Sequence, residues 1–166
     1  MRNALALILL LATGCGAAAP QVKVADILAN CAAYKAKPVQ AMGYLGECTR
    51  DGCFLAPHKA SWSAYASAWT NLQALGGSNA LSDAAKRAQQ SVNRFSPLGF
   101  KAEDAADDAI VDKAGPLQNS YVLMTGTIAK DGCNGIPDSD HSYGIKPTDI
   151  RVWTESEGAP VNSSRR

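Results

Sequence analysis

The fold is decided by the stretch Val39-Gln-Ala-Met-Gly-Tyr-Leu-Gly-Glu-Cys-Thr-Arg-Asp-Gly-Cys-Phe-Leu55. Residues 39–45 have the composition of a strand, and Asp51-Gly52 is a dipeptide that favours a tight turn between antiparallel strands. The chain returns from Cys53 onwards. We therefore predict a β-hairpin with Cys48 and Cys53 on the two sides of its bend.

A later stretch repeats this pattern. Tyr121 to Ala129 is strand-like and leads into Lys130-Asp-Gly-Cys133, which predicts a second hairpin. Each hairpin has a glycine inside its first strand, Gly43 and Gly126. We expect a bend or bulge at both glycines rather than a close contact with a neighbouring backbone. A final run, Asp149 to Thr154, alternates and is expected to pair with an earlier strand.

Four segments have helical spacing of apolar residues: 24–34, 61–75, 80–95 and 102–113. In the second of these, Trp62, Tyr65 and Trp69 lie near one side. Pro97 and Gly99 predict a loop before the fourth segment. That segment is rich in aspartate, but its carboxylates lack the spacing of a calcium loop, so we expect a solvated face and no metal site.

The amino terminus has the features of an export signal. Arg2 precedes an apolar run, residues 4–12, that is too short to span a bilayer. The run ends in Leu11-Ala-Thr-Gly-Cys15, which resembles the lipobox of bacterial lipoproteins. The resemblance implies removal of residues 1–14, a diacylglycerol on the sulfur of Cys15 and an acyl chain on its amino group. The alternative is a secreted protein that is cleaved near Ala18.

The same resemblance leads to a predicted location and a division of the chain. Gly16 after the cysteine resembles lipoproteins that are released to the outer membrane, so we expect a protein anchored there and facing the periplasm. Residues 15–22 would form a tether and residues 23–155 a single domain, with a helical insertion at about 61–113. Residues 156–166 would form a disordered tail.

The cysteines support an exported protein. Without Cys15, an even set of four is left in an oxidising compartment: Cys31, Cys48, Cys53 and Cys133. Four cysteines allow three pairings. We prefer Cys48 with Cys53, because residues on the two sides of a tight bend come close enough for a bridge, which leaves Cys31 with Cys133.

Four segments together are similar to uncharacterised exported bacterial domains of the oligonucleotide/oligosaccharide-binding (OB) barrel type: 22–29, 38–45, 121–128 and 145–153. The resemblance implies an α+β protein with a small antiparallel β-barrel, OB-like, and an inserted helical segment. Such a barrel does not by itself indicate a function.

Composition and motifs argue against several function classes. Loss of Arg2 with the signal leaves 15 basic and 15 acidic side chains and no basic stripe, so we expect no nucleic-acid partner. The chain has two histidines, no Gly-x-Ser-x-Gly motif and no zinc-ligand spacing. We therefore expect no catalytic residues, no metal and no cofactor, and predict that the protein is not an enzyme.

Binding is the function class that remains. Five aromatic residues could stack against sugars or other flat groups: Tyr44, Phe54, Trp62, Trp69 and Trp153. We predict a membrane-anchored envelope lipoprotein that acts as a non-catalytic binding or interaction module for an envelope protein, peptide or glycan. One rival is a periplasmic thiol-redox protein that uses Cys48 and Cys53. Another is a glycan-binding barrel.

Overall fold

The computed structural model describes residues 18–50, 52–77, 82–102, 104–129 and 144–154. Along this part of the chain the elements are β1 (Gln21–Lys23), α1 (Val24–Ala29), η1 (Cys31–Ala33), β2 (Pro38–Thr49), β3 (Gly52–Ala56), α2 (Lys59–Ala74), α3 (Asp83–Phe95), β4 (Leu98–Lys101), α4 (Ala105–Ala114), η2 (Gly115–Leu117), β5 (Tyr121–Ile128) and β6 (Ile145–Val152).

The strands form one sheet in the order β4-β3-β2-β5-β6, and β1 adds to it by parallel pairing with β2. All other pairings are antiparallel, so the predicted α+β class and the small antiparallel sheet are confirmed. The sheet curls until β4 and β6 approach each other. Among the described residues no strand pairing joins these two ends, and the sheet does not close into the expected barrel.

The predicted hairpin of residues 39–55 is present as β2 and β3. Cys48 lies directly opposite Cys53, and the pairing shifts by a bulge between Leu45 and Cys48. β5 and β6 pair as expected from the second hairpin pattern, while its predicted turn, including Asp131-Gly132, lies outside the described residues.

Both strand glycines are closely approached by a neighbouring backbone, and a Cβ at Gly126 would lie 2.4 Å from the carbonyl oxygen of Lys146. Gly126 lies at a register shift between β5 and β6, as expected for a bulge. At Gly43 the pairing with β5 is regular. The pairing thus gives no bulge at Gly43, and a Cβ there would lie 2.6 Å from the carbonyl oxygen of Ala56, so the alternative to a bulge, a close backbone approach, accounts for this glycine.

The region between the hairpins contains a strand that the sequence analysis missed. The loop predicted at Pro97 and Gly99 is wrong, because residues 98–101 form β4 and pair with β3. The expected helical insertion, 61–113, is therefore interrupted by a strand of the sheet. Likewise, β1 places Gln21 and Val22, which were assigned to the tether, in the sheet.

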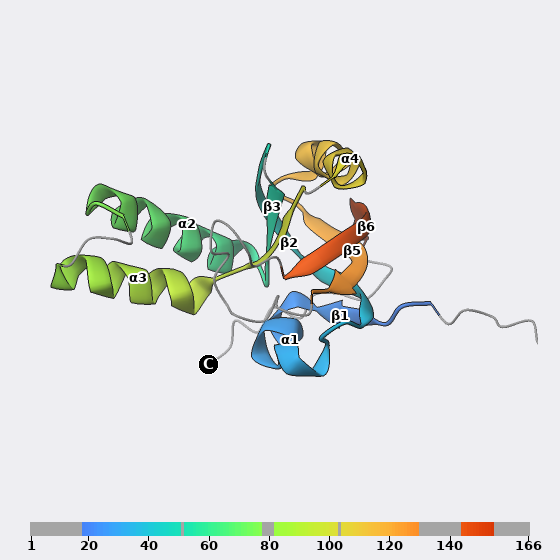
Figure 1. The fold of residues 1–166 in the computed structure, drawn as a ribbon, viewed down its shortest axis with the longest axis horizontal. Helices are drawn as coiled ribbons and strands as arrows, with labels where there is room; N and C mark the ends of the chain where they lie inside the picture. The colour runs from blue at the N-terminus through green and yellow to red at the C-terminus, as the bar shows by residue number, and fades with distance from the viewer. Residues whose placement is uncertain (1–17, 51, 78–81, 103, 130–143, 155–166) are drawn as a thin grey trace, which may run out of the picture.

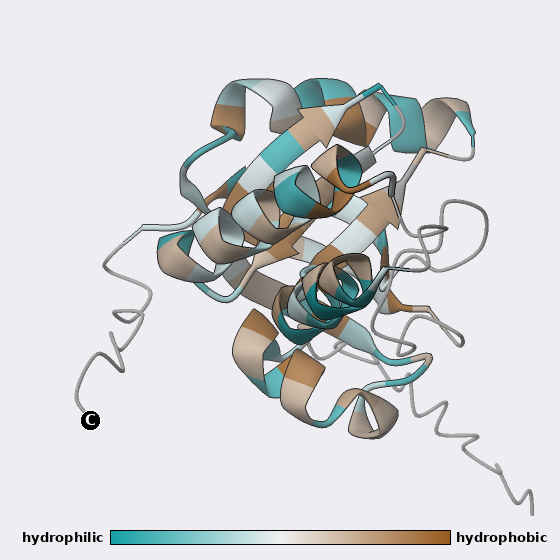
Figure 2. Cartoon of the chain, turned by 90° about the vertical axis from the view of Figure 1, so that its left-hand side faces the viewer, coloured by the Kyte–Doolittle hydropathy of each residue, from teal (hydrophilic) through white to brown (hydrophobic). Residues whose placement is uncertain are grey.

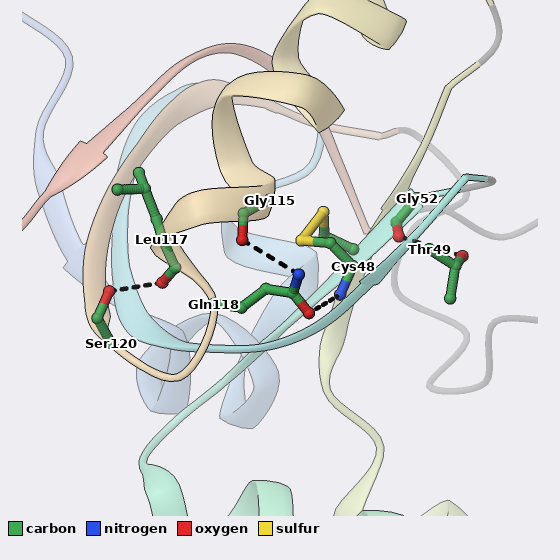
Figure 3. Close-up of a disulfide and its surroundings, with 8 residues drawn as sticks. Cys48, Thr49, Gly52, Gly115, Leu117, Gln118 and Ser120 are labelled. Atoms are coloured by element: carbon green, nitrogen blue, oxygen red, sulfur yellow. Dashed lines mark hydrogen bonds between the residues drawn. A yellow bond between two sulfur atoms is a disulfide. The ribbon is translucent and has the colours of Figure 1, made fainter.

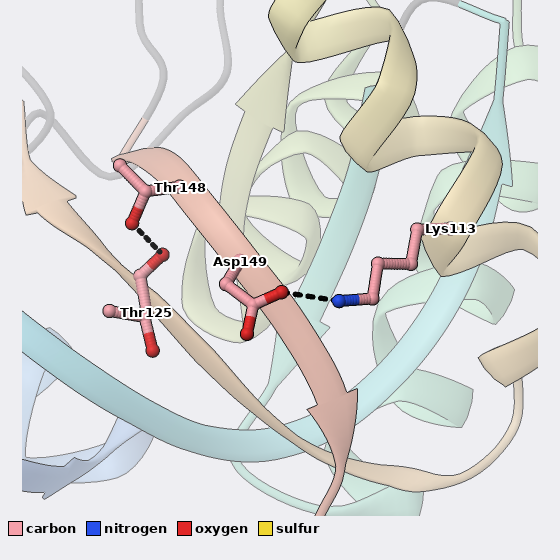
Figure 4. A network of polar contacts seen from close by, with 4 residues as sticks. All are labelled: Lys113, Thr125, Thr148 and Asp149. Carbon is pink, nitrogen blue, oxygen red and sulfur yellow. Dashed lines mark hydrogen bonds and ion pairs between the residues drawn. The ribbon is translucent and has the colours of Figure 1, made fainter.

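The main core lies on one face of the sheet, under α1 and α4. It consists of buried apolar side chains from every strand except β1, together with α1 and α4: Val24, Ile27, Val39, Ala41, Leu45, Cys53, Leu55, Leu98, Phe100, Ala114, Val122, Met124, Ile128, Ile145 and Ile150. Figure 4 shows how α4 is tied to β6 at the surface, where the ammonium group of Lys113 donates to a carboxylate oxygen of Asp149. On the same strand, the hydroxyl of Thr148 donates to the carbonyl of Thr125 at 3.3 Å.

α2 and α3 stand apart from this core. They pack side by side and project from the sheet (Figure 1). They share a second apolar cluster, made of Tyr65, Ala68, Leu72, Ala85 and Val92 with Trp62 and Ala88 at its margin. We refer to residues 59–95 as the helical arm.

Candidate functional site

The helical arm begins and ends where local sequence signals place its boundaries. His58 is the N-cap of α2, and its Nδ1 accepts the backbone N–H of Ser61 at 3.1 Å. Gly76 and Gly77 have positive φ angles of 96° and 74°, which end the helix. Ser82 is the N-cap of α3, and its hydroxyl accepts the backbone N–H of Ala85 at 3.1 Å.

Four aromatic rings adjoin one another from the sheet along α2, and we call them the aromatic stack. Phe54, Trp62 and Tyr65 are in mutual contact, with the Phe54 and Tyr65 ring centroids 5.9 Å apart. The ring centroids of Phe54, in β3, and Trp62 are 6.0 Å apart, and the angle between the ring planes is 23°. The ring centroids of Trp62 and Tyr65 are 5.7 Å apart. Those of Tyr65 and Trp69 are 6.5 Å apart, with an angle of 16° between the ring planes. Helical positions three and four residues apart share one face, so α2 aligns its three rings in a row.

Exposure varies along the aromatic stack, in which Phe54 and Trp62 are half-buried. Tyr65 is buried, with 7% of its surface exposed, whereas Trp69 is 43% exposed. Trp69 is therefore the ring of the stack that is most open to another molecule. Because it is supported by Tyr65 beneath it, little conformational freedom would be lost when a ligand stacks on it.

The stack is fixed to the sheet through a glycine. A Cβ at Gly46 would lie 2.3, 2.5 and 2.6 Å from three ring atoms of Trp62. The indole therefore lies directly on bare backbone in the bulged part of β2. Only glycine at this position lets Trp62 take its place between the sheet and Tyr65.

The surroundings of the stack contain few charges. Lys59 is the single charged residue in the 16 residues of α2. The outer surface of the helix instead exposes hydroxyl and amide groups, those of Ser63, Ser67, Thr70, Asn71 and Gln73. Burial raises the pKa of the Tyr65 phenol, and the nearby carboxylate of Glu47 raises it further, so Tyr65 stays protonated at neutral pH.

The five aromatic residues expected at a binding surface divide into two groups. Phe54, Trp62 and Trp69 belong to the aromatic stack, whereas Tyr44 and Trp153 are buried, with exposures of 4% and 7%. The hydroxyl of Tyr44 donates to the side-chain oxygen of Asn119 at 3.3 Å, and its ring meets Tyr121 edge-on. Tyr65 is the member that we did not select, although its spacing from Trp62 and Trp69 was a usable signal.

The preferred disulfide, Cys48 with Cys53, is present (Figure 3). Cys53 is 1% exposed, and Cys48 packs against the main core. The backbone N–H of Cys48 donates to the side-chain oxygen of Gln118 at 2.9 Å. The amide nitrogen of Gln118 in turn donates to the carbonyl of Gly115 at 3.1 Å, which links the hairpin to the segment after α4.

Two other cysteine predictions depend on residues outside the described part of the chain. Cys31 is disulfide-bonded and packs against the main core. Its predicted partner, Cys133, lies outside the described residues, and so does Cys15, the predicted lipid attachment point. The pairing of Cys31 with Cys133 and the lipidation of Cys15 stay predictions.

Asp104, at the start of α4, has a structural role. Asp104 is the N-cap and accepts the backbone N–H groups of Ala106 and Asp107 at 2.9 and 3.0 Å. These bonds lower the pKa of the Asp104 carboxyl, and the bond from the N–H of Asp107 has the larger effect. Within the described ranges, histidine, cysteine and carboxylate side chains do not gather in any group of three or more that could hold a metal ion. The helices described there include none that is both long and apolar enough to cross a membrane.

Comparison with known proteins identifies no relative: no family model, no curated protein and no solved structure matches the chain.

Proposed function

We propose that the chain is a lipid-anchored protein of the bacterial cell envelope that acts as a non-catalytic binding module. Lipid attachment at Cys15, after removal of residues 1–14, is supported by the lipobox-like sequence. An exported location is supported by the disulfide-bonded state of Cys31, Cys48 and Cys53, since disulfides persist in oxidising compartments. Attachment to the outer membrane, facing the periplasm, rests on Gly16 after the anchor. The OB-type resemblance is part of this proposal, and the approach of β4 to β6 supports it.

The aromatic stack is the observation that carries the binding function. It ends in Trp69, a large apolar ring that is 43% exposed on a helix with a single charge. Aromatic residues in surroundings depleted of charge are typical of the centre of a binding surface. We therefore place the ligand on Trp69 and on the adjoining hydroxyl and amide side chains of α2.

The environment of the disulfide favours this function over thiol-redox chemistry. A redox-active cysteine is partly exposed and commonly lies at the start of a helix, where its thiolate is stabilised. Cys48 and Cys53 lie on adjacent strands, and Cys53 is 1% exposed. We assign this disulfide to stability of the hairpin.

Two measurements test the proposal. The first is the intact mass of the protein extracted from its native membrane, alkylated with and without prior reduction. We expect a chain that begins at Cys15 with added acyl mass and whose four other cysteines are labelled only after reduction. A soluble chain without acyl groups would contradict the anchor, and direct labelling of Cys48 and Cys53 would favour the redox rival.

The second measurement is a titration of the protein with soluble cell-wall glycan fragments, followed by tryptophan emission. We expect a change in emission that Trp69→Ala removes. The matched control is Val152→Ala, which shortens an apolar side chain that is 47% exposed and lies outside the helical arm. If Val152→Ala weakens binding as much as Trp69→Ala does, the aromatic stack is not the site.

A further inference from the structure

The charges of the chain are unevenly distributed. The helical arm contains four cations, Lys59, Lys86, Arg87 and Arg94, and one anion, Asp83. The arm thus has an excess of three positive charges, while the whole chain has a formal charge of only +1. A near-neutral protein therefore presents a local positive potential on one projecting element.

These cations are accessible to a partner. Arg87 and Arg94 are exposed, and neither takes part in the salt bridges formed within the described part of the chain, Lys86 with Asp83 and Lys113 with Asp149. In the Lys86–Asp83 pair, Nζ of Lys86 lies 3.6 Å from Oδ1 of Asp83, and the two side chains are 63% and 83% exposed. Exposed pairs of this kind are weak, so Lys86 can exchange Asp83 for another anion at little cost.

Apolar surface is concentrated on the same element. Five large apolar side chains of the described surface are exposed, and three of them belong to the arm: Trp69, Leu75 and Phe95. In Figure 2 the arm projects toward the viewer, and polar and apolar segments alternate along its helices. A ligand for the arm therefore has to offer both apolar contacts and negative charge.

We propose that the ligand of the aromatic stack is an anionic glycan, a polysaccharide whose sugar units carry carboxylate groups. This inference rests on the proposed binding function and specifies its ligand. The apolar face of a sugar ring stacks on the indole of Trp69, and the hydroxyl and amide groups of α2 bond to sugar hydroxyls. Arg87 and Arg94 pair with the carboxylates, which guanidinium groups hold through two hydrogen bonds.

The arrangement of the arm allows one ligand to reach both sets of groups. α2 carries Trp69 and α3 carries the arginines, and the two helices pack side by side. Packed helices have axes about 8–10 Å apart, so a chain of a few sugar units can extend from one helix to the other.

The small charge excess favours a glycan over a nucleic acid. Binding to a nucleic acid depends on many contacts between cations and phosphates, and three excess positive charges are few for that purpose.

The test compares one acidic glycan with a neutral one. Oligogalacturonate, whose units each carry a carboxylate, and the neutral galactose oligomer of the same length are titrated into the full mature chain at low and high ionic strength. We expect tighter binding of oligogalacturonate, with an advantage that shrinks at high salt. The double variant Arg87→Gln, Arg94→Gln is expected to weaken oligogalacturonate binding about tenfold and to leave binding of the neutral oligomer unchanged.

The matched control is Lys35→Gln, Lys37→Gln, which removes two exposed cations outside the arm and is expected to change neither affinity. The inference is overturned if the double arginine variant binds oligogalacturonate as tightly as the wild type does. A loss of binding in Trp69→Ala would still support the binding module in that case. Equal or tighter binding of single-stranded DNA also overturns the inference. If neither oligomer binds and an envelope protein binds through the arm, the inference fails and the binding function stands. If none of these ligands binds, both the inference and the proposed binding function are contradicted.

Discussion

Replacement of Gly46 by alanine tests whether the aromatic stack depends on close contact between Trp62 and the sheet. The added Cβ would lie 2.3 to 2.6 Å from the indole, whereas carbon atoms in ordinary contact are about 3.5–4.0 Å apart. The ring would have to retreat by roughly 1 Å. It cannot do so alone, because Trp62 also stacks on Phe54 and contacts Tyr65.

We expect Gly46→Ala to lower the free energy of unfolding by about 1–3 kcal/mol, the usual cost of overpacking. With a urea dependence of about 2 kcal/mol per molar, a loss of about 2 kcal/mol lowers the unfolding midpoint by about 1 M. Unfolding is followed by far-UV circular dichroism, and tryptophan emission of the folded variant reports the displaced indole. Ligand binding at Trp69 should weaken as well, because Tyr65 lies between the two tryptophans in the stack.

The matched control is Gly115→Ala. A Cβ at Gly115 meets no atom within 4 Å, and its φ of −48° suits any residue. We expect this variant to be as stable as the wild type, or more stable by about 0.4–1 kcal/mol because its unfolded chain is less flexible. An unchanged urea midpoint in Gly46→Ala, or an equal loss in Gly115→Ala, would refute the packing argument.

Two further predictions concern the sheet. Replacing Cys48 and Cys53 together by serine is expected to lower the free energy of unfolding by roughly 2 kcal/mol, the value for so short a loop, and to leave glycan binding intact; an unchanged urea midpoint would contradict the structural role of this disulfide. The hydrogen bond from Lys113 lowers the pKa of the Asp149 carboxyl below its ordinary range, so this pair stabilises the folded state at neutral pH and ceases to do so as the pH falls through the lowered pKa. Because both side chains are about half exposed, Asp149→Asn should cost at most about 1 kcal/mol at neutral pH and nothing in strong acid, measured by urea unfolding across pH; a cost that does not depend on pH would contradict the ion pair.

The sequence by itself determined the elements whose signals are local. The turn dipeptide after Arg50 and the strand composition before it predicted the hairpin, and the hairpin placed Cys48 opposite Cys53. Helical periodicity predicted α2. The same spacing put Trp62 and Trp69 on one face, which is why part of the candidate site could be found without a structure.

Only the tertiary structure decided what depends on contacts between distant segments. β4 is a strand because β3 supplies its hydrogen-bond partners, although Pro97 and Gly99 are local signals for a loop. The burial of Tyr44 and Trp153 and the exposure of Trp69 follow from which segments cover each ring, and composition does not contain that information. Glycine is required at position 46 because α2 places the ring of Trp62 directly against it. The open edges of the sheet are likewise set by long-range pairing, because local periodicity identifies strands but not which of them become neighbours.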